Sequence, residues 1–343
     1  ITFTSLPEMV AFIFNDPHPT LCIAALLRIL LDDYGFSWEK AWDIVTRTIS
    51  YTNHTVMAEA LEKWPEGLFR QLLPRIYQIV CEINRRFTDE LWAFYPNDYR
   101  KVEYNAILSN GQVKMANLCL AASHTINGVS ALHSQILKDE VFRDYCNMHP
   151  NAFTNVTNGI TYRRWLCQSN PLLSDYIEKL IGDKFKKDAD ALKDLTKHAD
   201  NEAVLDKILD IKRENKVRLA KYIKEANGID VDPDSIFDVQ VKRLHEYKRQ
   251  LLNALHILDL YYRLKQNPDL DINPRTFIFG AKAAPSYYMA KQIIRLIHSL
   301  GNLINNDPDI KGKIKVVYIE NYRVTLAEII MPASDVSEQI SIA

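Results

Sequence analysis

The sequence predicts an α/β protein with a parallel sheet in its second half. Three short runs rich in β-branched and aromatic residues each precede a helical pattern: SIFDVQV (235–241), TFIFG (276–280) and IKVVYIE (314–320). Their ends are evenly spaced, since 39 residues separate Val241 from Gly280 and 39 separate Gly280 from Ile319. A strand, a crossover helix and their loops fit this spacing. We therefore expect ligands beyond the carboxyl ends of these strands.

Composition allows two globular domains and argues against two classes of partner. The 343 residues are 47% apolar and 25% charged, which is enough for two cores. The formal net charge is −1 and the pI is about 6.8. A nucleic-acid or membrane-surface protein would carry a basic excess over a whole face, and no apolar run is long enough to span a bilayer. Any anion site must be local.

The cysteines and the N-terminal stretch favour a cytoplasmic protein. Five cysteines are scattered along the chain without a CxxC pair: Cys22, Cys81, Cys119, Cys146 and Cys167. Most have apolar neighbours, so we expect buried, reduced thiols. The opening ITFTSLPEMVAF lacks the basic region and apolar stretch of a secretory signal.

The first part of the chain, to about residue 155, is predicted to be mostly helical. MVAFIF is expected to form a short strand that ends at NDPHPT, and Thr20 to cap the helix that follows. Apolar residues at three- and four-residue spacing predict further core-facing helices: SWEKAWDIVTRTI, EGLFRQLLPRIYQIVCEINRRF and MANLCLAASHTINGVSALHSQIL.

A domain boundary is expected in the Asn-rich stretch NAFTNVTNGI. It divides the chain into residues 1–157 and residues 158–343. The charge-rich segment 187–228 that follows reads as helices with solvated faces.

The stretch VKRLHEYKRQ, after the first predicted strand, concentrates positive charge. Lys242, Arg243, Lys248 and Arg249 lie within eight positions. We expect a helix from Glu246 onward, with Leu251, Leu252, Leu255 and Leu258 on its buried side and Lys248 directed into the crevice. Cations at a helix N-terminus oppose the macrodipole unless an anion is bound. The alternative is a set of exposed cations partly offset by Glu246.

The other two strand ends are less specific. GAKAAPS brings small residues to the second end, either for a ligand or for tight packing, and it is neither a GxGxxG nor a Walker motif. ENYRVTLAE brings Arg323 to the third end.

Two stretches of the first half, YTNHTVMAEALEKW and TNGITYRRW, combine amide, hydroxyl, imidazole and aromatic groups, which suits sugar hydroxyls. Structural roles as caps or core residues compete for His18, His54, His124 and His133. No His, Cys and Asp spacing indicates a metal.

Seven stretches together resemble the α-glucan (glycogen, starch and maltodextrin) phosphorylases, in order along essentially the whole chain. They are NDPHPT, YTNHTVMAEALEKWP, SHTINGV, TNGITYRRW, FDVQVKRLHEYKRQLLN, GAKAAP and ENYRVTLAE with PASDVSEQIS. The resemblance implies a GT-B architecture of two Rossmann-like domains around a cleft, with pyridoxal 5'-phosphate used for its phosphate group. It also implies a cytoplasmic homodimer that converts α-1,4-glucan and inorganic phosphate reversibly to glucose 1-phosphate.

The resemblance assigns the residues before 158 to the end of the N-terminal, glucan-binding domain and the rest to the start of the pyridoxal phosphate domain. It implies three groups of site residues. Catalytic roles fall to Arg243 and Lys248, on the substrate phosphate, and to His54. Substrate-binding roles fall to Asn158, Tyr247, Asp16 and His18. Cofactor-binding roles fall to Lys242, Tyr322, Arg323 and Trp165.

The sequence also departs from the family. Pro17, Tyr162, Ala281 and Ser286 replace a threonine, a proline and two glycines, which are mild changes. The lysine that binds pyridoxal covalently lies in an Asn-Met-Lys motif beyond a stretch like SEQISIA, whereas this chain ends at Ala343. We therefore expect a catalytically inactive internal piece of a phosphorylase.

Two other functions remain open from the sequence. One is a sugar-nucleotide-dependent glycosyltransferase of GT-B architecture, which would bind a nucleotide base and need no pyridoxal. The other is a non-catalytic piece that binds glucan or regulates a partner.

Overall fold

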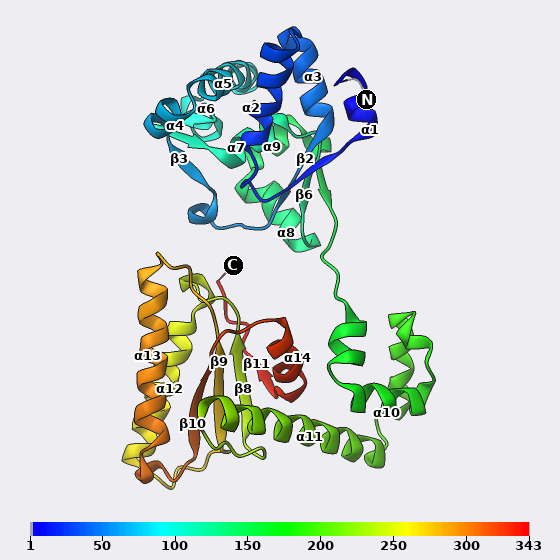
Figure 1. The fold of residues 1–343 in the computed structure, drawn as a ribbon, viewed down its shortest axis with the longest axis vertical. Coiled ribbons are helices and arrows are strands. Elements are labelled where there is room, and N and C mark those ends of the chain that lie inside the picture. Colours follow the sequence, from blue (N-terminus) through cyan, green and yellow to red (C-terminus); the bar gives the residue numbers. More distant parts are fainter. Residues whose placement is uncertain (1–2, 343) are drawn as a thin grey trace. The chain divides into compact units, whose positions relative to one another are not determined.

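The computed structural model describes residues 3–342 and consists of two compact units, Ile1–Gly159 and Ile160–Ala343 (Figure 1). The outermost ends of the two predicted domains, at residues 1–2 and 343, lie outside the described part. The observed division comes two residues after the predicted one, just past the Asn-rich stretch. The two units are described separately below.

Unit 1 is built on a parallel sheet that the sequence did not predict beyond its first strand. The strand order is β1-β2-β6-β7, with β1 at Phe12–Asn15, β2 at Ile49–Asn53, β6 at Ile126–Gly128 and β7 at Phe153–Asn155. Helices still make up most of unit 1, so the prediction of a mostly helical first part is confirmed. The parallel strands have five residues or fewer, which is too short for an alternating pattern to identify them.

Helices pack around this sheet, and a small antiparallel sheet β3-β5-β4 lies beside them. The helices are α1 Leu6–Met9, α2 Leu21–Arg28, α3 Trp38–Thr48, α4 Glu66–Leu72, α5 Pro74–Phe94, α6 Tyr99–Asn105, α7 Met115–Ala122, α8 Ala131–Ile136 and α9 Arg143–Met148. The antiparallel strands are β3 Lys63–Pro65, β4 Leu108–Ser109 and β5 Gln112–Lys114.

Three local predictions for unit 1 need correction. Pro74 divides the predicted helix 66–87 into α4 and α5, because proline has no N–H to continue the first helix. Residues 115–137 form a helix, a strand and a second helix. Thr20 does not cap α2 with its side chain, since its hydroxyl donates to Pro17 O and lies 3.0 Å from Cys119 Sγ.

Unit 2 contains the predicted parallel sheet, in the order β10-β9-β8-β11. The strands are β8 Ile236–Val241, β9 Arg275–Gly280, β10 Ile314–Ile319 and β11 Val336–Ser337. Val241 pairs with Gly280 and Gly280 with Ile319, so the three evenly spaced ends lie level. The α/β class with parallel strands is confirmed.

Helices cover both faces of the unit 2 sheet (Figure 1). The helices of the unit are α10 Pro171–Ile181, α11 Glu202–Asn227, α12 Gln250–Gln266, α13 Tyr288–Asn305 and α14 Val324–Ala333. Phe277 and Phe279 pack against α12 and α13, whereas Ile278 and Val317 pack against α11 and α14. This alternation is expected for a sheet buried on both sides.

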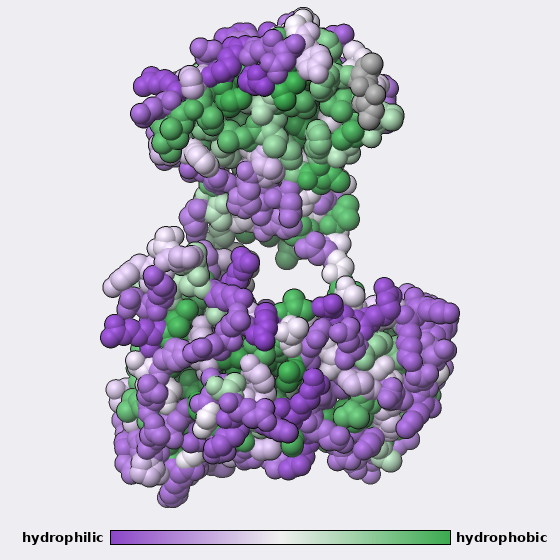
Figure 2. All heavy atoms as spheres, viewed as in Figure 1, coloured by the Kyte–Doolittle hydropathy of each residue, from purple (hydrophilic) through white to green (hydrophobic). Residues whose placement is uncertain are grey.

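The charge-rich segment is helical, as predicted, and mainly forms α11. Asn201 caps this helix by accepting a hydrogen bond from Val204 N, and Gly228 ends it in the left-handed region at φ 71°. Hydrophilic residues cover most of the visible face of unit 2 (Figure 2).

The cysteines differ in burial. Of the five cysteines, all free thiols, Cys119 is buried and Cys22 is exposed, so the prediction of buried thiols was wrong for Cys22. Burial raises the pKa of the Cys119 thiol to about 12. Among residues 3–342, no helix combines the length and apolar character needed to cross a bilayer.

A glycine at the end of β6 tests the packing of unit 1. A Cβ atom on Gly128 would lie 2.2 Å from Ser134 Oγ and 2.8 Å from Ser134 Cα in α8. Gly128→Ala should therefore lower the free energy of unfolding by about 1–3 kcal/mol, measured by urea denaturation. Gly67→Ala is the control, because nothing lies within 4 Å of its Cβ position and it sits in α4. Equal effects of the two changes would contradict this packing.

Candidate functional site

The cluster of positive residues predicted in VKRLHEYKRQ lies in a loop that leaves the carboxyl end of β8. We call residues Lys242–Arg249 the basic loop. Lys242 N donates to Gly280 O at 3.0 Å and Leu244 N donates to Lys282 O at 3.0 Å, so the loop stays attached to the chain beyond β9. A 3₁₀ turn at Glu246–Lys248 follows.

The helix after this loop begins later than predicted. Arg249 adopts the left-handed region at φ 58°, which interrupts the helical path, and α12 starts at Gln250. The predicted buried side was also wrong, because Leu251, Leu252 and Leu255 are 39%, 48% and 49% exposed. The shift in starting point places Lys248 in the 3₁₀ turn instead of on the helix.

Three cations of the basic loop crowd one another without a carboxylate partner. Among residues 3–342, no ion pair involves Lys242, Arg243 or Lys248, and Glu246 accepts from Tyr287 Oη at 2.6 Å instead. Burial lowers the pKa of Lys248, and the charges of Lys242 and Arg243 lower it further. Glu246 therefore does not offset the cluster, and an anion would relieve it.

The segment after β11 holds the opposite side of the basic loop. Lys242 Nζ donates to Glu338 O at 2.7 Å and to Gln339 Oε1 at 3.0 Å, and Arg249 Nε donates to Ile340 O. Burial lowers the pKa of Lys242, although the Glu338 carboxylate opposes the shift. Residues 338–342, which lie almost a hundred positions later in the sequence, thus hold the loop in place.

A hollow of about 500 Å³ opens beside the basic loop. It is lined by Arg243, Leu244, His245, Tyr247, Lys248, Lys282, Ala283, Ala284 and Tyr287. The small residues of the GAKAAPS stretch therefore border open space in part, so tight packing alone does not account for them. The His245 and Tyr247 rings, with centroids 4.7 Å apart, form the aromatic part of the wall.

Tyr322 lies at the same sheet edge. A Cβ atom on Gly280 would come within 3.0 Å of Val241 Cγ1 and 3.4 Å of Tyr322 Cβ, so a larger residue would be tightly packed against both side chains. The structure thus places Tyr322 beside Gly280, whose carbonyl accepts from Lys242 N.

Arg323 and Trp165 are less closely connected to the basic loop. Arg323 is exposed, and its Nη1 donates to Asn321 O at 3.2 Å. Trp165 belongs to the short helical segment Arg163–Gln168, which Glu328 of α14 holds through Arg164 at 3.5 Å and Gln168 at 3.3 Å. No described hydrogen bond joins Trp165 to the basic loop.

The predicted residues of unit 1 follow the carboxyl ends of its parallel strands. Asp16 comes after β1, His54 after β2 and Asn158 three residues after β7. Asp16, at φ 63°, accepts from His54 N at 3.1 Å, and the His54 ring is hydrogen-bonded to Asn15. Asn158 N donates to Val129 O at 2.9 Å. One sheet edge therefore brings these residues together.

His18 and His133 are two further histidines of unit 1 with polar contacts. His18 Nδ1 is 3.0 Å from Glu62 Oε2, and Glu62 Oε1 accepts from Trp64 Nε1 at 2.6 Å. His133 Nδ1 accepts from Val129 N at 3.1 Å, as a capping histidine does, while its buried Nε2 has no partner among the described atoms. Burial lowers the pKa of His133, and the nearby His54 lowers it further.

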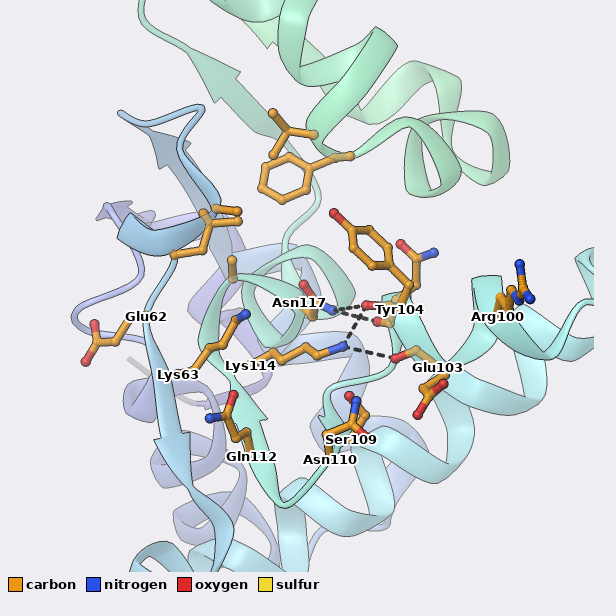
Figure 3. A pocket seen from close by; sticks show the side chains of 16 residues that line it. Glu62, Lys63, Arg100, Glu103, Tyr104, Ser109, Asn110, Gln112, Lys114 and Asn117 are labelled. Carbon is orange, nitrogen blue, oxygen red and sulfur yellow. Dashed lines mark hydrogen bonds between the residues drawn. The ribbon is translucent and has the colours of Figure 1, made fainter. Parts of the chain in front are cut away.

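A second hollow, of about 390 Å³, lies beside α6 in unit 1 (Figure 3). Lys114 Nζ donates to Glu103 O and Tyr104 O at 3.0 and 2.8 Å, and Asn117 donates to Tyr104 O, Asn105 O and Ala106 O. These donors satisfy the carbonyls at the C-terminal end of α6, so they stabilise the fold. Among residues 3–342 no cluster of His, Cys, Asp or Glu could hold a metal.

Asp238 is a buried carboxyl group near Glu338, which belongs to the segment that holds Lys242. Asp238 in β8 is 2% exposed, and its Oδ2 accepts from Arg275 Nη1 at 3.1 Å, whereas Oδ1 has no partner among the described atoms. Burial and the neighbouring Glu338 carboxylate raise the pKa of Asp238 to about 7, against the opposing charge of Arg275.

Comparison with known proteins identifies the family of the chain. The carbohydrate phosphorylase family model matches residues 1–343. The chain belongs to the carbohydrate phosphorylase family. It is 52% identical over 342 residues to a glycogen phosphorylase of Bacillus subtilis (strain 168), covering 100% of this chain and 43% of that protein.

Animal phosphorylases are similar to the chain to nearly the same degree. It is 47% identical over 344 residues to the human muscle form of glycogen phosphorylase, covering 99% of this chain and 41% of that protein, and 46% identical to the sheep muscle form over the same length. This carbohydrate phosphorylase chain thus spans about two fifths of the length of these relatives. The predicted resemblance is confirmed.

The raised pKa of Asp238 predicts a pH-dependent stability. The folded state keeps its proton up to about pH 7, whereas the unfolded chain loses it near the ordinary value of 3.8. This contribution to the free energy of unfolding is complete below the lower pKa and is lost as the pH rises through the higher one. As the pH rises from 5 to 8, we expect the free energy of unfolding of the wild type to fall by about 2 kcal/mol relative to that of Asp238→Asn.

The test is urea denaturation of both proteins across that pH range. Asp259→Asn, on the exposed side of α12, serves as the control and should follow the wild-type profile. Parallel profiles for wild type and Asp238→Asn would contradict a buried carboxyl that holds its proton.

Proposed function

We propose that the chain is part of an α-1,4-glucan phosphorylase (EC 2.4.1.1), a glycosyltransferase that releases glucose 1-phosphate from glucan ends by reversible phosphorolysis. The observation that carries the proposal is the cluster of unpaired cations in the basic loop. Family membership and the names of the relatives support it.

Arg243 and Lys248 would bind the substrate phosphate. Both line the hollow beside the basic loop, and neither has a carboxylate partner among residues 3–342. The guanidinium group of Arg243 can bind two phosphate oxygens at once, while Lys248 acts as a compact point charge. Charge that develops on phosphate oxygens during the reaction would be stabilised without reorganisation of these groups.

Lys242, Tyr322, Arg323 and Trp165 would face pyridoxal 5'-phosphate. The fit rests on the donor set, since the crowded ammonium of Lys242 and the Tyr322 hydroxyl suit a phosphate group. Pyridoxal phosphate would supply a phosphate that donates and accepts a proton. This chain's residues would hold that group and offset its charge next to the substrate phosphate.

The sugar would be bound mainly by polar groups at the sheet edge of unit 1. His54 and Asn158 provide a ring nitrogen and an amide for glucosyl hydroxyls, and Asp16 and His18 would line the adjoining space. Tyr247 from the basic loop would add a hydroxyl. Polar atoms near His54 would also stabilise positive charge that develops on the sugar.

The intact enzyme would be a cytoplasmic homodimer acting on glucan and inorganic phosphate, with no nucleic-acid or membrane partner. Neither rival function is favoured, because the relatives in the comparison are phosphorylases throughout.

Removal of the phosphate-binding cations tests the assignment. In the holoenzyme, Arg243→Ala and Lys248→Ala should each raise the KM for inorganic phosphate about 10–100-fold, as expected for a lost hydrogen bond to a charged group. Lys291→Ala, an exposed lysine of α13, is the control. An unchanged rate of glucose 1-phosphate release at low phosphate would refute these roles.

The role of unit 1 has a separate test. His54→Ala should lower the turnover of glucan at least tenfold and leave phosphate binding, measured by ³¹P NMR, unchanged. His124→Ala provides a histidine control. The described side-chain contact of His124 is with its neighbour, at 2.8 Å from Nδ1 to Thr125 Oγ1, and not with a candidate site residue. A His54→Ala protein with normal turnover would remove His54 from the site.

A further inference from the structure

Three amide side chains are buried between β8 and α12, where apolar residues would be expected. Gln240 is 1% exposed, Gln250 is 2% exposed and Asn253 is 5% exposed. Their neighbours include Ala254 and Ile257 of the hydrophobic core. Buried amides lower stability unless their polar atoms are hydrogen-bonded, so the partners of these three indicate why they are there.

Two of the partners are backbone carbonyls of the basic loop, those of Arg243 and Lys248. Gln240 Nε2 donates to Lys248 O at 3.2 Å, and Gln250 Nε2 donates to Arg243 O at 3.2 Å. Asn253 Nδ2 donates to Gln240 Oε1 at 3.0 Å and so orients that amide. The network therefore holds the backbone of both residues assigned to the substrate phosphate.

The loop needs such a restraint because of its own charge. Lys242 and Arg243 repel Lys248, none of the three forms an ion pair among the described residues, and Arg249 interrupts the helix immediately afterwards. When the site holds no anion, repulsion favours an opened loop. Internal hydrogen bonds that resist opening would preorganise the cations before phosphate arrives.

The side-chain oxygen of Gln250 indicates that this residue positions the loop and does not serve to stabilise the core. Gln250 Oε1 is buried and has no partner among the described atoms. An apolar side chain of similar size would avoid this unfavourable burial. The glutamine is thus explained by what its amide donor does for Arg243 and poorly explained by the stability of the core.

We propose that Gln240, Gln250 and Asn253 are positioning residues that hold Arg243 and Lys248 in place for phosphate. The inference rests on the proposed function, in which these two cations bind the substrate phosphate. It extends that function to three residues that line neither of the two hollows described above.

The test uses Gln250→Met in the holoenzyme, which removes the donor and nearly keeps the volume of the side chain. We expect the KM for inorganic phosphate to rise about tenfold, as for one lost hydrogen bond, with the KM for glucan unchanged. Urea denaturation should show no loss of stability. Gln266→Met, exposed at the end of α12, is the matched control and should behave as wild type. Gln240→Met should also raise the KM for inorganic phosphate, because it removes the hydrogen bond to Lys248 O.

A double variant separates positioning from a general structural effect. If Gln250 acts through Arg243, then adding Gln250→Met to Arg243→Ala should cause no further rise in the phosphate KM. Additive losses, or an equal rise in the KM for glucan, would overturn the inference. If Arg243→Ala weakens phosphate use and Gln250→Met does not, the positioning role fails while the proposed function stands. If Arg243→Ala itself has no effect, the proposed function fails.

Discussion

The structure of unit 2 depends on holding like charges together at the end of a β-strand. Lys242, Arg243 and Lys248 share one short loop, and among the described residues none of them forms an ion pair with a carboxylate. Their repulsion is balanced by contacts on every side: the pairing to the chain beyond β9, the buried amides beneath, and the segment after β11. The same imbalance of charge makes the loop suitable for an anion.

Much of this arrangement could be predicted from the sequence where the signal was strong. The even spacing of Val241, Gly280 and Ile319 reflects three strands that end level, because each crossover has the same length. The basic stretch could be placed at that edge for the same reason. Family resemblance, carried by long motifs, indicated roles that spacing alone could not.

The failures have physical causes. The strands of unit 1 are too short for an alternating pattern to identify them, as in Ile126–Gly128. The start of α12 depends on a left-handed Arg249, which nothing in its local sequence demands, and the shift reassigns the buried face to residues such as Ala254 and Ile257. Contacts of Gln240 and Gln250 depend on tertiary packing and were not visible in the sequence.

The tie between Lys242 and the backbone of Glu338 has a consequence for biogenesis. A ribosome adds Gln339, the second partner of Lys242, 97 residues after that lysine, so the nascent chain cannot form this tie until those residues have been made. The ordered arrangement of this basic loop therefore depends on residues that are synthesised well after the loop itself.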